Sequence, residues 1–541
     1  MESFFKSGEL KFTAWFFKGI LGLVFLVLLT RTLDLQIVRG EYFKGLADDN
    51  RMREVSIIAK RGDILASGGE VIAQSSEVKK EIILDSEAGF IKRAVGNSHS
   101  DNLVTEWKRH YPEGQVFAHA LGYIGEVNEK ELGKVAAECP EKGAVKLGDL
   151  TGRGGIEETY DCTLRGVNGA ELIEVDARGQ KVRTLGRKLP QDGGNITTSL
   201  HIGLQKLITA QMQGKSGGVV VLDKDAKILA LVSSPSFDPN AFISPGDNYL
   251  VNNILHEASL PLLNRTISGS YHPGSIYKPI VALGALENGV ISEDFKYEDT
   301  GSIVVNSPYG NFSFSNWYYL QYGGKEGEIG ITRALARSTD TFFYKVGEML
   351  GPEAMAEWSR RFGLDDVTGI KLPGEVSGLV PDPSWKEAAL GERWFLGNTY
   401  NTSIGQGDLA VTPLAIAAAL TAVTNGGRKC TPQLVQNDEP QCEDLGLTTK
   451  FTDIVKKGMV EACTTGGTGY TFFDFADKYG VQVACKTGTA QNVNKDPHSW
   501  FFAFAPLDNP EIFAVVLVEE GGEGSKVAGP IARTIFDYWF Q

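Results

Sequence analysis

Histidine and cysteine are scarce in this sequence. Its 541 residues include seven histidines and six cysteines, and none of them forms a C-x-x-C or H-E-x-x-H pattern. Between His272 and His498 there is no histidine at all. Zinc sites are built from closely spaced groups of these two residue types. We therefore expect no metal site and no cofactor.

The cysteines are also too few for this length to indicate a disulfide framework. Cys430 and Cys442 could form a disulfide across a polar loop if the compartment is oxidising. Free cysteine is commonly buried as a small apolar side chain, so the sequence favours isolated buried thiols. The six are Cys139, Cys162, Cys430, Cys442, Cys463 and Cys485.

Clusters of positive charge are missing as well. The chain has 53 Lys and Arg against 67 Asp and Glu, which gives a net charge of -14 at pH 7, and no Lys/Arg run stands out. Binding to nucleic acid requires clustered cations that neutralise phosphates. Nucleic acid is therefore excluded as a partner.

One long apolar run is present near the N-terminus. Residues 12–30, FTAWFFKGILGLVFLVLLT, carry a single charge at Lys18, and a helix of this length spans about 28 Å, close to the bilayer core. A cleaved signal peptide is the alternative, but the LLTRTLDLQ that follows offers no small-x-small cleavage site. We expect an uncleaved transmembrane anchor after a cytoplasmic tail of residues 1–11. The bulk of the chain would then lie outside the cytoplasm, on the cell (inner) membrane.

The sequence changes character at the linker-like QDGGN of residues 191–195. Residues 31–195 mix short helical and extended pieces and are expected to form a mixed α/β domain. Residues 196–541 contain two apolar strands within 217–240 and three more within 483–520, with helices between and after them. This pattern predicts an α+β domain with one mainly antiparallel five-stranded sheet flanked by helices.

A serine and a lysine open the apolar helix predicted for residues 275–289. Pro273-Gly274 places Ser275 at the helix N-terminus, where free N–H groups favour developing negative charge, and Lys278 is one turn further on. Burial would lower the pKa of the lysine and let it take the serine proton. The alternative is a capping serine beside a lysine that reaches solvent. The S-x-x-K pattern alone decides nothing, because it also occurs at residues 3–6 and 76–79.

Two further motifs follow in order along the chain. Ser338-Thr339-Asp340 lies between two helical runs, and Lys486-Thr487-Gly488-Thr489 lies on a predicted strand. Lys486 would supply a second cation, the two threonine hydroxyls could hold a carboxylate, and Gly488 would leave room for an approaching backbone, such as an edge-binding peptide. Each motif is weak alone, since S-x-D recurs elsewhere and a glycine-containing edge strand is common.

All three motifs together resemble the penicillin-binding proteins. Longer segments extend the resemblance to class B penicillin-binding proteins, and the amino-terminal ones to the penicillin-binding protein 2 branch, the monofunctional transpeptidases of cell elongation. The resemblance implies a penicillin-binding/β-lactamase-like transpeptidase domain over residues 196–541 on a pedestal of residues 31–195. The segments are RGDILASGGEVIA, RHYPEGQVFAHALGYIGEV, GRGGIEETYD, NRTISGSYHPGSIYKP, GIKLPGEVSGLVPDPSWK, WFLGNTYNTSIGQGDLAVTPLAIA and KTGTAQ.

The resemblance also implies catalytic roles. Ser275 would attack the penultimate carbonyl of a D-alanyl-D-alanine stem peptide and form an acyl-enzyme. Lys278 would be the base, Ser338 would pass the proton towards the leaving amine, and Asp340 would position Lys278. An amine from a neighbouring strand would then take the acyl group and form the crosslink, without a cofactor.

Substrate binding is implied in the same way. Lys486, Thr487 and Thr489, with Gly488 between the threonines, would hold the substrate carboxylate. The backbone N–H groups of Ser275 and Thr489 would form the oxyanion hole. β-Lactams would bind at this site, and a membrane glycosyltransferase of the elongation complex would be the partner.

Several departures from the family pattern are visible. The second motif has Asp340 where asparagine is common, although relatives in this branch also use aspartate. Cys485 stands where glycine usually precedes the lysine, so a thiol there would narrow the site or become oxidisable. Only 35 residues separate Ala73 from Arg109, fewer than the branch normally has, so partner contacts are not carried over residue by residue.

Other functions are open to such a chain. A septal (division) transpeptidase has the same chemistry. A bifunctional class A enzyme would need a glycosyltransferase domain, and a β-lactamase would need a deacylating base of the E-x-x-L-N kind, which we do not find. The non-enzyme alternative is a penicillin sensor or an inactive scaffold, but a scaffold would be expected to lose Ser275 or Lys486.

Overall fold

The structure is a computed structural model of the whole chain. It describes residues 2–85, 89–94, 103–176, 181–243, 248–307, 310–492 and 495–541. The short stretch between Ala73 and Arg109 includes residues 86–88 and 95–102, which lie outside the described residues.

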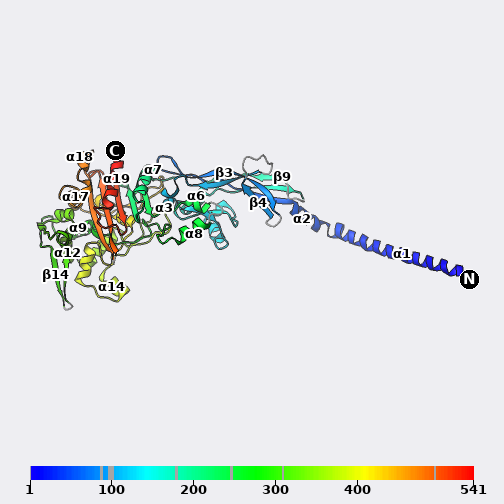
Figure 1. The fold of residues 1–541 in the computed structure, drawn as a ribbon, viewed down its shortest axis with the longest axis horizontal. Helices are drawn as coiled ribbons and strands as arrows, with labels where there is room; N and C mark the ends of the chain where they lie inside the picture. The colour runs from blue at the N-terminus through cyan, green and yellow to red at the C-terminus, as the bar shows by residue number, and fades with distance from the viewer. Residues whose placement is uncertain are drawn as a thin grey trace. The chain divides into compact units, whose positions relative to one another are not determined.

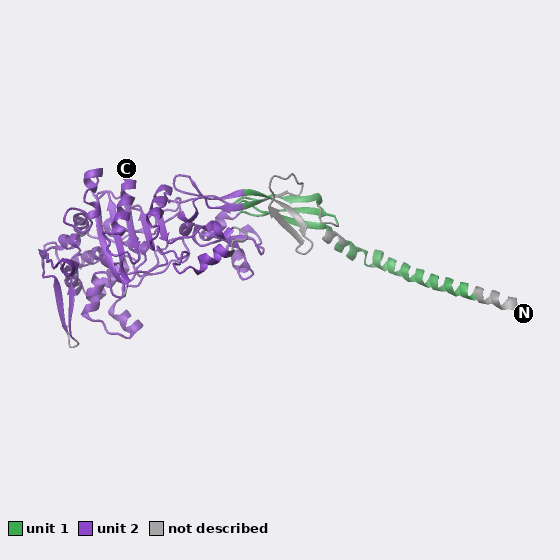
Figure 2. Cartoon of the chain, viewed as in Figure 1, with its two compact units in different colours: residues 1–60, 77–107, 166–192 green, residues 61–76, 108–165, 193–541 purple. Residues whose placement is uncertain are grey.

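The chain divides into two compact units (Figure 2). Unit 1 comprises residues 1–60, 77–107 and 166–192, and unit 2 comprises residues 61–76, 108–165 and 193–541. Each is described by itself below. The candidate motifs all belong to unit 2.

Unit 1 begins with a long apolar helix, α1 (Glu2–Leu33). The stretch Phe12–Val38 is long and apolar enough to cross a membrane, and none of its most apolar part is buried in protein. The predicted anchor therefore coincides with an apolar helix that is free to face lipid.

A small antiparallel sheet of three strands is part of unit 1. Its strand order is β1-β8-β9, and Met52 of β1 pairs with Glu174 of β8. The described elements of this unit are α1, the π-helical turn η1 (Asp34–Val38), α2 (Gly40–Arg51), β1 (Met52–Ile57), β4 (Gly89–Ala94), β8 (Gly169–Val175) and β9 (Lys181–Lys188), with parts of β3 (Val71–Asp85) and β5 (Leu103–His110).

Unit 2 is built around a five-stranded sheet with the order β12-β11-β21-β20-β19 (Figure 1). All neighbouring strands are antiparallel, which confirms the predicted fold class. Strand β19, which carries the K-T-G-T motif, lies at one edge and, among the described strands, pairs with β20 alone. The strands are β11 (Gly217–Leu222), β12 (Ile228–Ser234), β19 (Ala484–Asn492), β20 (Lys495–Ala505) and β21 (Ile512–Val518).

Both faces of this sheet are buried. Successive side chains of each strand point to opposite faces, and each face packs in its own core. Val220 and Leu222 of β11 belong to a core shared with α9, α12, α16 and α17, whereas Val219 and Val221 belong to a core shared with α7 and α19. The strands therefore read as continuous apolar runs rather than as alternating ones.

Unit 2 also contains the following described helices and smaller strands. Before β11 they are β2 (Ile64–Leu65), η2 (Gly114–Val116), α3 (Ala118–Leu121), β6 (Tyr123–Glu126), α4 (Leu132–Glu138), η3 (Pro140–Lys142), β7 (Leu150–Arg153), α5 (Gly155–Thr159), α6 (Asp161–Leu164), β10 (Ile196–Thr197) and α7 (Ile202–Gln211). After β12 they are η4 (Pro239–Ile243), α8 (Asn248–His256), η5 (Gly274–Tyr277), α9 (Lys278–Glu287), β13 (Tyr297–Asp299), β14 (Ser302–Ser307), β15 (Gly310–Ser315), α10 (Trp317–Tyr322), β16 (Gly327–Ile329), α11 (Ile331–Arg337), α12 (Asp340–Leu350), α13 (Pro352–Arg361), α14 (Pro383–Leu390), α15 (Leu396–Ser403), α16 (Pro413–Thr424), β17 (Arg428–Cys430), β18 (Cys442–Asp444), α17 (Thr449–Ala462), η6 (Tyr470–Phe472), α18 (Phe475–Tyr479) and α19 (Ala528–Trp539).

The expectation of isolated thiols is wrong. All six cysteines form disulfides, in the pairs Cys139–Cys162, Cys430–Cys442 and Cys463–Cys485. Each bond joins two segments that are separate in sequence and adjacent in the fold. Composition does not show which segments are adjacent. Extensive disulfide bonding is typical of oxidising compartments outside the cytosol.

A buried cluster of charges lies in the amino-terminal part of unit 2. Glu157 is completely buried and accepts hydrogen bonds from Arg61 Nε at 2.6 Å, Arg109 Nε at 2.7 Å and the Tyr111 hydroxyl at 3.1 Å. Arg61 also pairs with Asp161 at 2.6 Å. Burial alone would raise the pKa of Glu157, but the two guanidinium groups hold it below its ordinary value. The R-G-D-I segment is thus tied to the G-R-G-G-I-E-E segment by paired charges.

Candidate active site

Ser275 lies on a 3-10 turn, η5, and the α-helix begins three residues later at Lys278. The sequence predicted that the helix would begin at the serine itself. Pro279 accounts for the difference, because proline has no N–H and is tolerated only in the first helical turn. Ser275 therefore sits just before a buried helix, partly accessible to solvent.

Glycines let three backbone segments meet around this turn. Gly274 has φ +57°, and its N–H donates to Gly405 O at 2.8 Å. A Cβ on Gly405 would lie 2.1 Å from Gly274 O, and a Cβ on Gly274 would lie 3.0 Å from Thr489 O. No side chain larger than hydrogen fits between these segments.

Gly488 has the close neighbour that the sequence predicted, but the neighbour is the serine turn. A Cβ on Gly488 would lie 3.0 Å from Ile276 Cγ2 and 3.2 Å from Pro273 O. The glycine thus allows the turn that carries Ser275 to lie directly against β19.

Lys278 is completely buried and has a full set of hydrogen bonds. Its Nζ donates to Asp340 Oδ1 at 2.6 Å, to Ser338 O at 2.8 Å and to Ser338 Oγ at 3.2 Å. Burial lowers the pKa of Lys278, and the carboxylate of Asp340 opposes this shift. Within the described part of the chain, Ser275 Oγ is not among the hydrogen-bond acceptors of this amine.

Ser338 lies at the junction between α11 and α12, as predicted. It adopts a left-handed conformation with φ +55° at the C-terminus of α11, and Asp340 begins α12. The second carboxylate oxygen of Asp340 accepts from Trp317 N at 3.2 Å. The junction therefore presents both the Ser338 carbonyl and its hydroxyl to the lysines.

Lys486 reaches the same serine from the edge strand. It is completely buried, and its Nζ donates to Ser338 Oγ at 2.8 Å and to Thr487 O at 3.0 Å. Burial lowers the pKa of Lys486 well below its ordinary value, and the positive charge of Lys278 lowers it further. States in which only one of the two lysines is positively charged are therefore favoured.

The threonines of β19 differ in exposure. Thr487 is 8% exposed and its hydroxyl donates to Thr468 Oγ1 at 2.9 Å, whereas Thr489 is exposed. Thr489 Oγ1 accepts from Gly524 N at 3.3 Å, and its carbonyl accepts from Gln406 Nε2 at 3.3 Å.

Sequence reasoning missed three residues that support this constellation: Trp317, Gln406 and Thr468. Gln406 belongs to a segment that resembles the family, so the segment was noticed but not its contact with Thr489. Trp317 and Thr468 lie in stretches that carry no motif, and only the folded structure brings them to Asp340 and Thr487.

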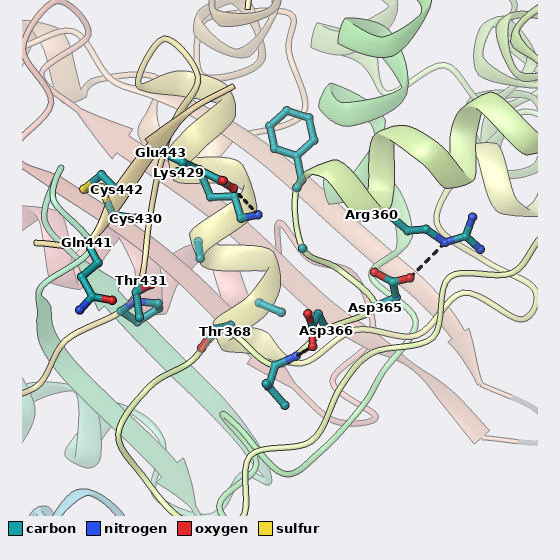
Figure 3. A pocket seen from close by; sticks show the side chains of 16 residues that line it. Arg360, Asp365, Asp366, Thr368, Lys429, Cys430, Thr431, Gln441, Cys442 and Glu443 are labelled. Atoms are coloured by element: carbon teal, nitrogen blue, oxygen red, sulfur yellow. Dashed lines mark hydrogen bonds and ion pairs between the residues drawn. A yellow bond between two sulfur atoms is a disulfide. The ribbon is translucent and has the colours of Figure 1, made fainter. Parts of the chain in front are cut away.

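A separate pocket of about 500 Å³ lies beside the Cys430–Cys442 disulfide (Figure 3). Four of its charged side chains pair with one another: Arg360 with Asp365 at 3.1 Å, and Lys429 with Glu443 at 2.7 Å. None of the motif residues lines it. The candidate catalytic groups lie elsewhere, where the two lysines contact Ser338.

Family models match most of the chain. Residues 217–537 match the penicillin binding protein transpeptidase domain, and residues 78–198 match the penicillin-binding protein dimerisation domain.

Sequence relatives match most of this chain. The peptidoglycan D,D-transpeptidase MrdA of Haemophilus influenzae is 30% identical over 601 residues, which cover 97% of this chain and 91% of that protein. MrdA of Acinetobacter baumannii is 33% identical over 465 residues, which cover 81% of this chain and 66% of that protein.

Solved structures agree with the sequence relatives. Penicillin-binding protein PBP2 of Helicobacter pylori in complex with MreC aligns with a TM-score of 0.76 at 25% identity, covering 90% of this chain and 98% of that one. PBP2 of Pseudomonas aeruginosa in complex with WCK 5153 gives 0.72 at 28% identity, covering 90% and 96%. A chain from a peptidoglycan synthase complex that coordinates polymerization and crosslinking gives 0.77 at 25% identity, covering 97% of each chain.

The matched transpeptidase model covers more than half of the sequence, and a relative at 30% identity is matched over most of its own length. The chain therefore belongs to the penicillin-binding proteins with a serine-type transpeptidase domain, an acyl-transfer enzyme family.

Proposed function

We propose that the chain is a membrane-anchored peptidoglycan D,D-transpeptidase that crosslinks stem peptides through an acyl-enzyme on Ser275. The observation that carries this proposal is the convergence of Lys278 Nζ and Lys486 Nζ on Ser338 Oγ, at 3.2 and 2.8 Å. The relatives named D,D-transpeptidase MrdA support the same reaction.

In the acylation step, Ser275 Oγ attacks the carbonyl carbon between the last two D-alanines. The O–C bond forms as the C–N bond breaks, and the terminal D-alanine leaves as an amine. Lys278 acts as the base in its neutral form, which keeps two N–H donors for Asp340 and Ser338 and has a lone pair for Ser275. This lone pair takes the serine proton. Ser338 passes its proton to the leaving nitrogen and takes one back from Lys278, so that the base is neutral again when the terminal D-alanine leaves. An amine of a second stem peptide then attacks the ester, forms the crosslink and frees Ser275.

Binding of the donor peptide would use the edge strand. Lys486, Thr487 and Thr489 would hold the terminal carboxylate, with Gly488 leaving room between the strand and the serine turn. The backbone N–H groups of Ser275 and Thr489 would donate to the developing oxyanion, and each such donor is worth about 3 kcal/mol in other acyl-transfer enzymes. β-Lactams would acylate Ser275 by the same route.

We place the protein in the inner membrane, with residues 1–11 in the cytoplasm, residues 12–30 as the anchor, residues 31–195 as the pedestal and residues 196–541 outside as the transpeptidase domain. The apolar helix supports the anchor. Matches to PBP2 bound to MreC and to a peptidoglycan synthase complex support a role in cell elongation beside a membrane glycosyltransferase.

The test is labelling of the full-length protein, held in detergent micelles, with a fluorescent penicillin. We expect a long-lived adduct on the Ser275 peptide, identified by mass spectrometry, and no adduct in Ser275→Ala. A folded wild-type protein without an adduct would overturn the proposal in favour of a scaffold. An adduct that is hydrolysed rapidly would indicate a β-lactamase instead.

Elongation and division are separated by the phenotype of depletion. Rod-shaped cells that lose an elongation transpeptidase are expected to round up, whereas cells that lose a septal one form filaments. Filaments would assign the chain to division.

A further inference from the structure

A glycine-rich loop, residues 463–469, connects the end of α17 to η6. It is compact: Gly467 N donates to Thr464 O at 2.9 Å, and Gly469 N donates to Ala462 O at 2.8 Å. The mechanism above uses none of its residues. We call residues 463–469 the clamp loop.

The clamp loop holds β19 on both sides of Lys486. The Cys463–Cys485 disulfide joins it to the residue just before the lysine, and the 2.9 Å hydrogen bond between Thr487 Oγ1 and Thr468 Oγ1 joins it to the residue just after. A Cβ on Gly469 would lie 2.4 Å from Cys485 Sγ, so the loop lies directly against the disulfide. Both cysteines are buried.

The same loop is attached to the helix that ends at Ser338. Thr468 N donates to Ala336 O at 3.2 Å, and Arg337 Nη1 donates to Gly466 O at 3.2 Å. Ala336 and Arg337 are the last two residues of α11. One short segment therefore connects the element that carries Ser338 to the strand that carries Lys486.

We propose that the clamp loop is a positioning device for the transpeptidase site. In this proposal the Cys463–Cys485 disulfide and Thr468 are positioning elements that keep Lys486 against Ser338 and orient the Thr487 hydroxyl for the substrate carboxylate. The proposal rests on the function proposed above and adds three residues to it.

Two physical arguments support a need for such a device. Strand β19 is an edge strand: among the described strands its backbone pairs with β20 alone, and the bond from Gln406 Nε2 to Thr489 O adds one further contact. Its position beside the serine turn therefore depends on few backbone hydrogen bonds. In addition, two lysine side chains converge on one hydroxyl, and like charges at this distance repel whenever both are protonated. A covalent bond next to Lys486 prevents the strand from moving away.

The role of Thr468 follows from the chemistry of hydroxyl groups. A hydroxyl can donate one hydrogen bond and accept two. When a carboxylate binds at Thr487, the Thr487 proton turns to the carboxylate and the Thr468 hydroxyl donates to Thr487 in return. Thr468 thereby keeps Thr487 in the rotamer that faces the substrate, without contacting the substrate itself.

The first test compares Thr468→Val with Thr464→Val. Thr464 lies in the same loop, but its hydroxyl bonds to Glu461 O of α17. We measure the second-order rate constant of acylation by benzylpenicillin and by its methyl ester, which lacks the carboxylate. Thr468→Val should slow the acid roughly tenfold, because Thr487 then loses its hydrogen bond to the carboxylate and a hydrogen bond to a charged group is worth about that much. The ester should be nearly unchanged. Thr468→Ser should restore the rate, and Thr464→Val should not alter it.

The second test removes the disulfide by Cys463→Ser with Cys485→Ser. The matched control removes the Cys430–Cys442 disulfide in the same way, because this bond lies beside the separate pocket of Figure 3. We expect both double variants to unfold at lower temperature, but only the Cys463/Cys485 variant to lose acylation rate and to show a displaced pH profile.

The outcomes distinguish the clamp from the function on which it rests. A wild-type protein that penicillin does not acylate would contradict the proposed function. A wild-type protein that is acylated, with Thr468→Val equal to Thr464→Val or slowing acid and ester alike, and with the two disulfide variants equally active, would overturn the clamp alone.

Discussion

Lys486 Nζ donates a 2.8 Å hydrogen bond to Ser338 Oγ. Lys278 Nζ donates to the same oxygen at 3.2 Å, so both acceptor positions of the hydroxyl are occupied by lysine nitrogens. The hydroxyl proton of Ser338 is then free to point away from both lysines. A group arranged in this way can hand its proton to a leaving amine and recover one from a lysine.

Replacement of Ser338 by alanine should therefore slow acylation without unfolding the domain. We expect the second-order rate constant for penicillin acylation to fall roughly a hundredfold, within the range of proton-transfer catalysis. Ser199→Ala is the control, because Ser199 is also buried and hydrogen-bonded, to Ile228 O at 2.7 Å, away from the lysines. Equal losses in both variants would show that Ser338 is needed for stability and not for proton transfer.

Replacement of Asp340 by asparagine should shift the pH dependence. The Asp340 carboxylate raises the pKa of Lys278 against the effect of burial, so removal of its charge lowers this pKa and makes the neutral base available at lower pH. The acid limb of the acylation profile, measured across roughly pH 6 to 10, should move to lower pH. Asp365→Asn, in the separate pocket, should leave the profile in place. A limb that moves to higher pH would contradict this role for Asp340.

Addition of one methyl group at Gly488 should disturb the nucleophile. The Cβ of Gly488→Ala would lie 2.9 Å from Trp500 Cβ and 3.0 Å from Ile276 Cγ2, so it crowds both β20 and the serine turn. A displacement of about 1 Å costs roughly a hundredfold in rate, which penicillin acylation would report. Gly186→Ala, in strand β9 with open space around it, should have no effect; unchanged acylation in Gly488→Ala would disprove the close packing.

Removal of the buried charge at Glu157 should destabilise unit 2. Glu157→Gln leaves Arg61 and Arg109 with one carboxylate fewer, and breaking a buried ion pair costs about 3–5 kcal/mol. The pKa of Glu157 is below its ordinary value, so its contribution is complete above the ordinary carboxylate pKa and is lost as the pH falls through the lowered one.

Thermal unfolding at about pH 7 and about pH 4 checks this prediction. The variant should unfold at a clearly lower temperature at the higher pH, and the difference from the wild type should shrink at the lower pH. A constant difference would assign the loss to packing rather than to charge.

The sheet could be predicted from the sequence because its strands are short, continuous apolar runs. Runs such as 217–222 and 512–518 are apolar at every position, which indicates strands covered on both faces, and the turn at Asp223–Ala226 separates a pair. Ser338 was expected between helices for a similar reason, since the apolar patterns of α11 and α12 stop on either side of it. The order of the strands within the sheet needed the fold.

The environment of the lysines and cysteines could not be predicted in this way. Lys278 contacts Asp340 across 62 positions in the chain, and such pairings depend on how helices stack. Six cysteines allow many pairings, and spacing does not choose among them. Thr468 lies in a loop of glycines and threonines whose only signal is turn composition. Local sequence patterns do not show which distant segments come into contact.

The Cys463–Cys485 disulfide also bears on when the protein matures. Thiols stay reduced in the cytosol, so with the chain oriented as proposed this bond forms only after the domain has crossed the membrane. Until this bond forms, a newly exported molecule would have the nucleophile and both lysines but no disulfide to fix strand β19. Maturation of the site would then depend on the supply of oxidant outside the membrane, and a cell short of that oxidant would accumulate anchored enzyme that crosslinks slowly.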